Sequence, residues 1–355
     1  MKIGILGGGQ LARMLALAGH PLGLEFIVLC PSTEACAAPV TEHLLADFDD
    51  TQALQQLADK ADVITYEFEN VPAESVEFLS KNNMVFPPPL ALSTGCDRLK
   101  EKTLFNTLGI KTANFADISD LKSLLNAIDT IGLPAILKTR TEGYDGKGQF
   151  VLRDRNDAEA AWQSLNGSPV ILEGFVNFER EVSIIAVRSS TGEMAFYPLS
   201  ENVHREGILR LSTSLSNDPM QPKAENYASQ LLEKLDYVGV LAIEFFQKDN
   251  ELLVNEYAPR VHNSGHWTIE GAHTSQFENH LRAILSLPLG STALTSNAAM
   301  INLIGEIPNM SGVLKLPDAH LHLYGKAPRE GRKVGHITLL DNNKDTLMKH
   351  VEQLS

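Results

Sequence analysis

The opening of the chain constrains its fold more than any other segment. Residues 3–6 are apolar and typical of a buried strand, residues 7–9 are three glycines, and apolar residues recur at helical spacing over residues 10–18. A strand that passes through a tight glycine turn into a helix is the first half of a parallel βαβ unit. The opening therefore predicts a parallel sheet covered by helices.

The same alternation continues over the first ninety residues. Strands are predicted at 26–29 and 63–66, with a helix over 51–61 between them. Phe86 is followed by three prolines, which punctuate the chain. We expect an α/β amino-terminal domain of βαβ type over residues 1–95.

The pattern changes after this point to α+β, with much antiparallel pairing. A charged helix is predicted over 97–108. Strands are predicted at 133–138, 150–152, 170–172, 182–187, 241–246 and 252–255. We expect a central domain of two subdomains over residues 96–295 and a small carboxy-terminal domain over 296–355. A glycine-spaced loop at 143–149, between two strands, predicts a lid over about 138–200.

Composition excludes several classes of function. The formal charge of −14 disfavours binding to nucleic acid or to anionic lipid, and no apolar run reaches the length of a membrane span. The three cysteines form no CxxC pair, which disfavours a disulfide framework or a zinc ribbon. The first residues lack the apolar core of a signal peptide. We therefore expect a cytoplasmic protein whose partners are small molecules.

The first glycine cluster leaves a dehydrogenase open as an alternative. Gly7-x-Gly9-x-x-Ala12 follows a strand and matches the loose dinucleotide fingerprint. A dinucleotide site also needs an acid at the end of the second strand, but Leu29 is followed by Cys30 and a proline. We interpret the turn as a helix amino terminus whose N–H groups can hold phosphate, or as a plain packing turn. Titration with a reduced nicotinamide distinguishes the dehydrogenase.

Two carboxylates interrupt two neighbouring apolar strands. Glu244 lies in the strand 241–246, and Glu256, twelve residues later, directly follows the strand 252–255. A hairpin would bring the two carboxylates together, and two buried carboxylates repel unless a cation lies between them. Mg²⁺ suits such a pair because it accepts one or two carboxylates together with phosphate oxygens. The sequence therefore predicts metal ligands at Glu244 and Glu256, with two solvent-facing glutamates as the alternative.

Basic and glycine residues supply candidate phosphate contacts. Lys138 ends a predicted strand, and Lys147 lies within the glycine loop. Residues 173–176 have the pattern of a connector between two strands.

Taken together, these motifs resemble the ATP-grasp superfamily. More closely, the chain is similar to the 5-(carboxyamino)imidazole ribonucleotide synthase family in four segments, which run nearly from end to end. They are Gly7-Gly8-Gly9-Gln10-Leu11, Tyr66-Glu67-Phe68-Glu69, the block from Asn255 to Thr268 and Gly331-Arg332-Lys333-Val334-Gly335-His336.

The resemblance implies an ATP-dependent carbon–nitrogen ligase of purine biosynthesis. Bicarbonate would attack the γ-phosphate of ATP to give carboxyphosphate, and the amine of 5-aminoimidazole ribonucleotide would capture the carboxyl group. ATP and Mg²⁺, or Mn²⁺, would be the cofactors, and the family suggests a homodimer. Catalysis would consist mainly of positioning and charge neutralisation.

The resemblance also implies roles for individual residues, assigned by position. The ATP contacts would be Arg98, Lys138, Gly143, Tyr144, Asp145, Gly146, Lys147, Gly148, Gln149, Glu173, Gly174, Phe175, Val176, Glu181, His204, Asn255 and Glu256. The bicarbonate pocket and catalytic group would be Arg260, His262, Asn263, Lys333 and Asp145. The aminoimidazole ribonucleotide contacts would be Gln10, Glu67, Tyr144, Lys147, Lys326 and Arg332.

Two positions leave choices open. Arginine also occurs in the family where this chain has Lys147, and lysine keeps the charge while losing the bidentate fork. Glu67 and Glu69 alternate onto one face of their segment, so either carboxylate can meet the substrate amine.

Two further alternatives concern the activity. A formate-using glycinamide ribonucleotide transformylase shares the fold and the acyl-phosphate chemistry. A regulatory protein that binds nucleotide without turnover is the non-enzyme alternative. Dependence of ATP cleavage on bicarbonate or on formate distinguishes all three.

Overall fold

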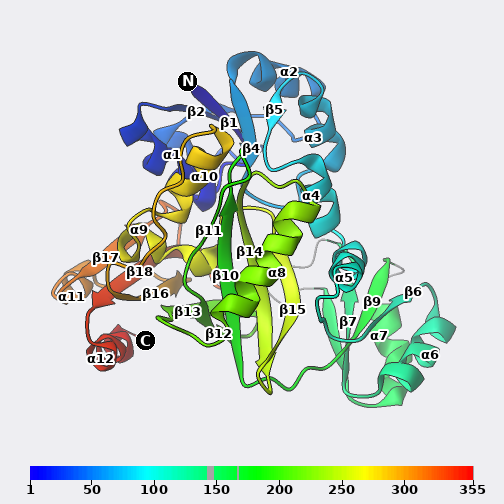
Figure 1. The fold of residues 1–355 in the computed structure, drawn as a ribbon. Coiled ribbons are helices and arrows are strands. Elements are labelled where there is room, and N and C mark those ends of the chain that lie inside the picture. The colour runs from blue at the N-terminus through cyan, green and yellow to red at the C-terminus, as the bar shows by residue number, and fades with distance from the viewer. Residues whose placement is uncertain (142–147, 166–167, 355) are drawn as a thin grey trace.

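The computed structural model describes residues 1–141, 148–165 and 168–354. Its strands form a parallel sheet of five strands, a central sheet of nine and a small sheet of four, which Figure 1 shows as separate parts. The predicted combination of α/β and α+β architecture is confirmed. The predicted loop residues Gly143, Tyr144, Asp145, Gly146 and Lys147 lie outside the described residues.

The five-stranded sheet is parallel throughout and has the order β3-β2-β1-β4-β5. Its elements are β1 (Lys2–Leu6), α1 (Gln10–Gly19), β2 (Glu25–Leu29), β3 (Glu42–Leu44), α2 (Thr51–Lys60), β4 (Val63–Tyr66), α3 (Ala73–Ser80) and β5 (Met84–Val85). The strands and helices predicted for this region are confirmed. The sequence pattern missed β3 and β5, because strands of two or three residues are too short to show a periodicity.

Both faces of this parallel sheet are buried. Ile3 and Ile5 pack in one cluster with α1, whereas Leu6 packs in another with α2 and α3. Parallel sheets are covered on both faces by their crossover helices, and their strands are therefore almost continuously apolar. This is the physical reason why the opening strand has no polar residue between Ile3 and Leu6.

The central sheet has the order β15-β14-β10-β12-β13-β16-β18-β17, with β11 paired to β10, and its neighbours are antiparallel. Its strands are β10 (Arg180–Arg188), β11 (Met194–Phe196), β12 (Ser200–Arg205), β13 (Ile208–Ser214), β14 (Gly239–Lys248), β15 (Glu251–Ala258), β16 (Asn297–Ile304), β17 (Ala319–Leu323) and β18 (Lys333–Asp341). Because β16 pairs with β13, the carboxy-terminal strands extend this sheet.

Helices cover both faces of the central sheet. Ile184 and Ile243 pack with α8 (Gln221–Lys234), and Ile185 and Ala242 pack in the cluster that contains α10 (Gln276–Ile284). Successive side chains of a strand point to opposite faces, so β10 and β14 contribute to both cores. Apart from the helices of the small sheet, the other α-helices are α4 (Pro89–Gly95), α5 (Arg98–Thr107), α9 (Thr268–Gly271), α11 (Met310–Val313) and α12 (Lys344–Leu354).

The small sheet has the order β6-β9-β7-β8 and is antiparallel. Its elements are β6 (Phe115–Ile118), α6 (Leu121–Ile131), β7 (Ala135–Thr139), β8 (Gln149–Leu152), α7 (Ala158–Ser164) and β9 (Val170–Gly174). The prediction that residues 173–176 form a connector is wrong for Glu173 and Gly174. Both end β9, because Glu173 pairs with Ile136 in the ladder and only Phe175 and Val176 lie beyond it.

Among the described residues, no helix combines the length and the apolar character that crossing a bilayer requires.

Candidate active site

A cleft lies where the amino-terminal region meets the central sheet, including the start of strand β18. Gln10 and Glu67 line it from the first region, and Lys333 lines it from the start of β18. Ten of the predicted residues are part of its lining: Gln10, Glu67, Arg98, His204, Glu244, Glu256, Arg260, His262, Asn263 and Lys333. Residues that are hundreds of positions apart in the sequence therefore meet around one cavity.

The two strand glutamates face each other across the β14/β15 hairpin. Glu244 and Glu256 are register partners, as the hairpin interpretation predicted. The side chain of Glu244 is 15% exposed and that of Glu256 is 41% exposed, so the first is well buried and the second reaches the cleft. The alternative prediction, that both glutamates face solvent, is wrong for Glu244.

The surroundings of the two carboxyl groups differ. Burial and the nearby charge of Glu256 raise the pKa of Glu244 to about 7. Burial opposes ionisation of Glu256 as well, but the guanidinium of Arg98, 2.8 Å from its Oε2, outweighs burial and lowers its pKa to about 2. A cation between the two groups would relieve the repulsion that raises the pKa of Glu244. The donor set thus fits a divalent metal.

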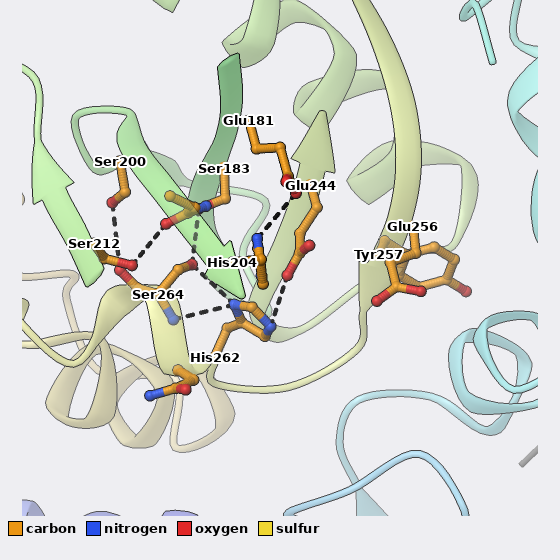
Figure 2. A network of polar contacts seen from close by, with 12 residues as sticks. Glu181, Ser183, Ser200, His204, Ser212, Glu244, Glu256, Tyr257, His262 and Ser264 are labelled. Carbon is orange, nitrogen blue, oxygen red and sulfur yellow. Dashed lines mark hydrogen bonds and ion pairs between the residues drawn. The ribbon is translucent and has the colours of Figure 1, made fainter. Parts of the chain in front are cut away.

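Glu181 and His204 lie on the other side of Glu244. Ligand atoms of these three residues lie within 4.8 Å of one another, and His204 Nδ1 is 3.0 Å from Glu181 Oε2 (Figure 2). Burial lowers the pKa of His204, but its contact with Glu181 outweighs burial and raises it. The group places an imidazole, whose protonated form Glu181 favours, at an acidic corner of the cleft.

His262 is held from both ring nitrogens. Its Nε2 is 3.1 Å from Glu244 Oε1, and its Nδ1 is 2.9 Å from Ser264 Oγ (Figure 2). Burial, Arg260 and Lys333 lower the pKa of His262 to about 3, so the ring is neutral at pH 7.

A chain of hydrogen bonds behind His262 selects its tautomer. Ser212 Oγ donates to Asn202 Oδ1 at 2.6 Å, Asn202 Nδ2 donates to Ser183 Oγ at 2.9 Å, and Ser183 Oγ donates to Ser264 Oγ at 2.7 Å. The hydroxyl hydrogen of Ser264 is then directed at His262 Nδ1. With Nδ1 as the acceptor, Nε2 of His262 carries the hydrogen and donates to Glu244.

Arg260 is fixed by a bidentate ion pair. Its Nε lies 2.5 Å from Glu69 Oε2 and its Nη2 lies 3.0 Å from Glu69 Oε1. Burial raises the pKa of Glu69, but Arg260 outweighs burial and lowers it. Of the two acids in the segment 67–69, Glu69 therefore orients the guanidinium.

Glu67 instead occupies the amino terminus of α1. Its Oε2 accepts a hydrogen bond from Ala12 N at 2.9 Å, and its Oε1 accepts one from Gly9 N. A Cβ on Gly7 or Gly9 would lie 2.3 Å and 2.7 Å from atoms of Glu67, so the turn requires glycine. The interpretation of these N–H groups as phosphate ligands is wrong for Gly9 and Ala12, because an internal carboxylate already accepts from them.

Two lysines share one buried carboxylate beside the small sheet. Lys138 Nζ is 3.0 Å and Lys102 Nζ is 3.3 Å from Glu173 Oε2. Lys102 was missed in the sequence, where a lysine within a charged helix has the pattern of a solvated one. Glu101 and Arg140, which line the cleft, were missed as well: Glu101 lies in the same charged helix, and Arg140 follows β7 outside any motif.

Predicted residues outside the lining of the cleft include Lys326 and Phe175. Lys326 donates from Nζ to Gln10 Oε1, and the Asn263 and Asn302 amides form a reciprocal pair at 3.0 and 2.7 Å. Phe175 is exposed beyond β9, close in sequence to Phe178, which stacks on Phe246. The other predicted residues are Gly148, Gln149, Val176, Asn255 and Arg332.

Comparison with known proteins places this site in a family. The chain matches the family models of the ribonucleotide synthetase preATP-grasp domain over residues 1–95 and of the ATP-grasp domain over 103–277. It also matches the phosphoribosylaminoimidazole carboxylase C-terminal domain over 298–350.

The relatives cover the chain from end to end. N5-carboxyaminoimidazole ribonucleotide synthase of Pseudomonas aeruginosa is 55% identical over 354 residues, which are 100% of this chain and 98% of that protein. The chain belongs to the N5-carboxyaminoimidazole ribonucleotide synthase family. The predicted resemblance is confirmed, and the chain is an ATP-grasp ligase of purine biosynthesis. The transformylase and dehydrogenase alternatives are not favoured.

Solved structures of N5-carboxyaminoimidazole ribonucleotide synthases share this fold. The synthetase of Thermus thermophilus superposes with a TM-score of 0.96 at 55% identity, covering 99% of this chain and 97% of that one. The Aspergillus clavatus synthase in complex with ADP and 5-aminoimidazole ribonucleotide has a TM-score of 0.91 at 30% identity, covering 99% and 97%.

Proposed function

We propose that this chain carboxylates the amine of 5-aminoimidazole ribonucleotide with bicarbonate, through carboxyphosphate, with cleavage of ATP to ADP and phosphate. The observation that carries the proposal is the meeting of the paired acids Glu244 and Glu256 with Arg260, His262 and Lys333 in one cleft. The first pair suits a metal–phosphate group, and the basic residues suit a carboxyphosphate beside it.

Glu244 and Glu256 would hold Mg²⁺, or Mn²⁺, with Asn255 beside them. The metal would supply positive charge that offsets the negative charge of the transferring phosphoryl group. The two glutamates are suited to this role because one is buried with a raised pKa and its partner is ionised. Arg98 keeps Glu256 ionised and directs the carboxylate toward the hairpin partner.

The nucleotide would lie between the small sheet and the central sheet. Lys138 lies near the end of β7 and would meet the phosphates, and Glu181 and His204 are suited to the ribose and phosphate side. Phe175 and Val176 follow β9 in a connector whose backbone groups are suited to reading adenine. The ATP contacts predicted at Gly143, Tyr144, Asp145, Gly146 and Lys147, together with the lid over about 138–200, remain part of this proposal.

Arg260, His262, Asn263 and Lys333 would form the bicarbonate pocket. Glu69 pre-orients the guanidinium of Arg260, so that its remaining N–H groups are directed at a bound anion without further loss of side-chain freedom. His262 is neutral, and its single N–H, on Nε2, donates to Glu244, so the ring would line the pocket and hold the carboxylate of Glu244 without adding a positive charge. The cations of the pocket stabilise the oxyanion that develops during carboxyl transfer.

The aminoimidazole ribonucleotide would bind at the amino-terminal side of the cleft. Gln10 and Glu67 line that side, and Lys326 contacts Gln10 from the carboxy-terminal region. Lys326 and Arg332 would meet the 5′-phosphate as cations. We assign Glu67 to the substrate amine, since Glu69 is engaged by the guanidinium of Arg260, whereas Glu67 accepts from the neutral N–H groups of Gly9 and Ala12 and keeps lone pairs for a further donor.

The domain boundaries, the oligomeric state and the location in the cell are proposed from the same family resemblance. We propose three domains over residues 1–95, 96–295 and 296–355, a homodimer, and a cytoplasmic location where the other purine intermediates are made.

The proposal is tested by ADP release with MgATP and bicarbonate, with and without 5-aminoimidazole ribonucleotide, against a matched set with formate and glycinamide ribonucleotide. Stimulation only by the aminoimidazole supports the proposal. Stimulation only in the formate set would reassign the substrate, and no stimulation in either set would indicate the regulatory alternative.

A further inference from the structure

Strand β15 contains a bulge next to the proposed metal-binding glutamate. Phe245 pairs with Val254, but the next position along β14, Glu244, pairs with Glu256, so Asn255 is an extra residue in the ladder. A regular continuation would have paired Glu244 with Asn255 and turned Glu256 to the opposite face. The bulge is therefore what places the two carboxylates on the same face.

Strand β15 lies at the edge of the central sheet, so its outward backbone groups at the bulge need partners outside the ladder, and helix α5 supplies them. Tyr257 N donates to Glu101 Oε1 at 2.5 Å, and Lys102 Nζ donates to the carbonyl oxygen of Asn255 at 3.1 Å. Glu101 and Lys102 are each 1% exposed. Such buried polar groups are costly unless their partners are in place, so the two contacts constrain the bulge strongly.

The same face of α5 also contacts Glu256, which lies between Asn255 and Tyr257. Arg98 Nη1 donates to Glu256 Oε2 at 2.8 Å. Positions 98, 101 and 102 are i, i+3 and i+4, which lie side by side on a helix. Three neighbouring side chains of α5 thus meet three consecutive residues of β15.

Lys102 extends this contact to the small sheet. Its Nζ is 3.3 Å from Glu173 Oε2, which Lys138 also contacts at 3.0 Å. The ammonium group of Lys102 therefore joins the carbonyl of Asn255 to Glu173 at the end of β9, and the carboxylate of Glu173 joins both to Lys138 of β7.

We propose that Glu101 and Lys102 are positioning residues that hold the bulge at Asn255 and thereby direct the carboxylate of Glu256 toward Glu244. They act through Glu256 and its backbone neighbours. The inference rests on the proposed function only in that Glu256 is taken as a metal ligand.

The first experiment measures the backbone without any ligand. Hydrogen–deuterium exchange in a peptide that contains Tyr257 reports the hydrogen bond to Glu101. Glu101→Leu removes the acceptor, and exchange of the Tyr257 amide should accelerate by about tenfold or more. Glu101→Gln keeps an acceptor oxygen in place and should exchange as the unmodified protein does. Lys100→Met, an exposed position on the same helix, is the matched control.

The second experiment measures metal binding directly, by electron paramagnetic resonance titration of Mn²⁺ in the presence of ADP. Glu101→Leu and Lys102→Met should weaken Mn²⁺ binding by about tenfold, in the range seen when groups that orient metal ligands are removed. Glu101→Gln and Lys100→Met should bind Mn²⁺ within about twofold of the unmodified protein. Glu101→Asp, one methylene shorter, replaces Glu101→Leu if that variant does not fold.

The variant Glu256→Gln distinguishes a wrong metal assignment from a wrong positioning role for α5. If it leaves Mn²⁺ binding unchanged, the metal assignment in the proposed function is wrong. If it weakens binding while Glu101→Leu and Lys102→Met keep both tight binding and slow exchange, the positioning role of α5 alone is overturned.

Discussion

His262 Nε2 lies 3.1 Å from Glu244 Oε1, and this contact joins the proposed bicarbonate pocket to the proposed metal site. The opposite ring nitrogen meets Ser264, which ends a hydrogen-bond chain from the interior of the central sheet. The orientation of an imidazole that lines the cleft is thus set by residues that are not part of the cleft lining.

Removal of the hydroxyl next to His262 should therefore affect turnover. Ser264→Ala removes the hydroxyl at 2.9 Å from Nδ1 and leaves only the longer hydrogen bond from Ser264 N at 3.3 Å. The ring is then held more weakly, so we expect kcat to fall by about tenfold while KM for ATP stays within about twofold. Steady-state kinetics with ATP and bicarbonate varied separately check this. Ser200→Ala is the control, because the Ser200 hydroxyl contacts the backbone oxygen of Ser264 and the indole of Trp267. Equal losses of kcat in the two variants would contradict the prediction.

Loss of the partner of Arg260 should cost both stability and anion binding. Glu69→Ala leaves a buried guanidinium without its bidentate carboxylate, and we expect the free energy of unfolding to fall by about 3 kcal/mol. KM for bicarbonate should rise by about tenfold, since the guanidinium is no longer pre-oriented. Urea unfolding and initial rates measure the two effects. An unchanged KM would remove Arg260 from the bicarbonate pocket.

The glycine turn of the opening motif should not tolerate a side chain. In Gly7→Ala, the new Cβ would lie 2.3 Å from Cγ of Glu67, and the backbone at this position has a φ of +114°. We expect a loss of about 2 kcal/mol or more in the free energy of unfolding, together with weaker aminoimidazole ribonucleotide binding. Gly23→Ala, which has a φ of +74° but open space around its Cβ, isolates the cost of the backbone conformation. Similar losses in both variants would show that contact with Glu67 is unimportant.

The raised pKa of Glu244 predicts a pH dependence of stability. Its pKa is about 7 in the folded protein and about 4.5 in the unfolded chain, so the folded state binds the extra proton between these values. The contribution of this group to stability is then fully present below about pH 4.5 and is lost as pH rises through about 7. Glu101, whose pKa burial raises to about 8, adds a slope of the same sign.

The contribution of Glu244 is obtained by difference. The free energy of unfolding of the unmodified protein relative to Glu244→Gln should fall by about 2 kcal/mol between pH 5 and pH 8 without metal. Saturating Mg²⁺ with ADP should diminish this fall, because a cation favours the ionised carboxylate. Denaturant titrations at each pH supply the values. Parallel pH profiles for the two proteins would contradict the raised pKa.

The sequence by itself determined the parts of the molecule that depend on local patterns. The opening strand, turn and helix showed their periodicity directly, and the paired glutamates were visible as single acids in apolar strands. The family followed from motifs that are continuous in the chain, such as the block from Asn255 to Thr268.

Only the tertiary structure decided which partners these residues have. Glu69 and Arg260 are 191 positions apart, and their pairing depends on how the amino-terminal region lies against the central sheet. Lys102 is an ordinary lysine in a charged helix until the bulge of β15 brings the carbonyl of Asn255 to it. A sequence pattern reports the spacing of residues along one element, whereas buried ion pairs and bulges depend on the register and packing of elements that are distant in the chain.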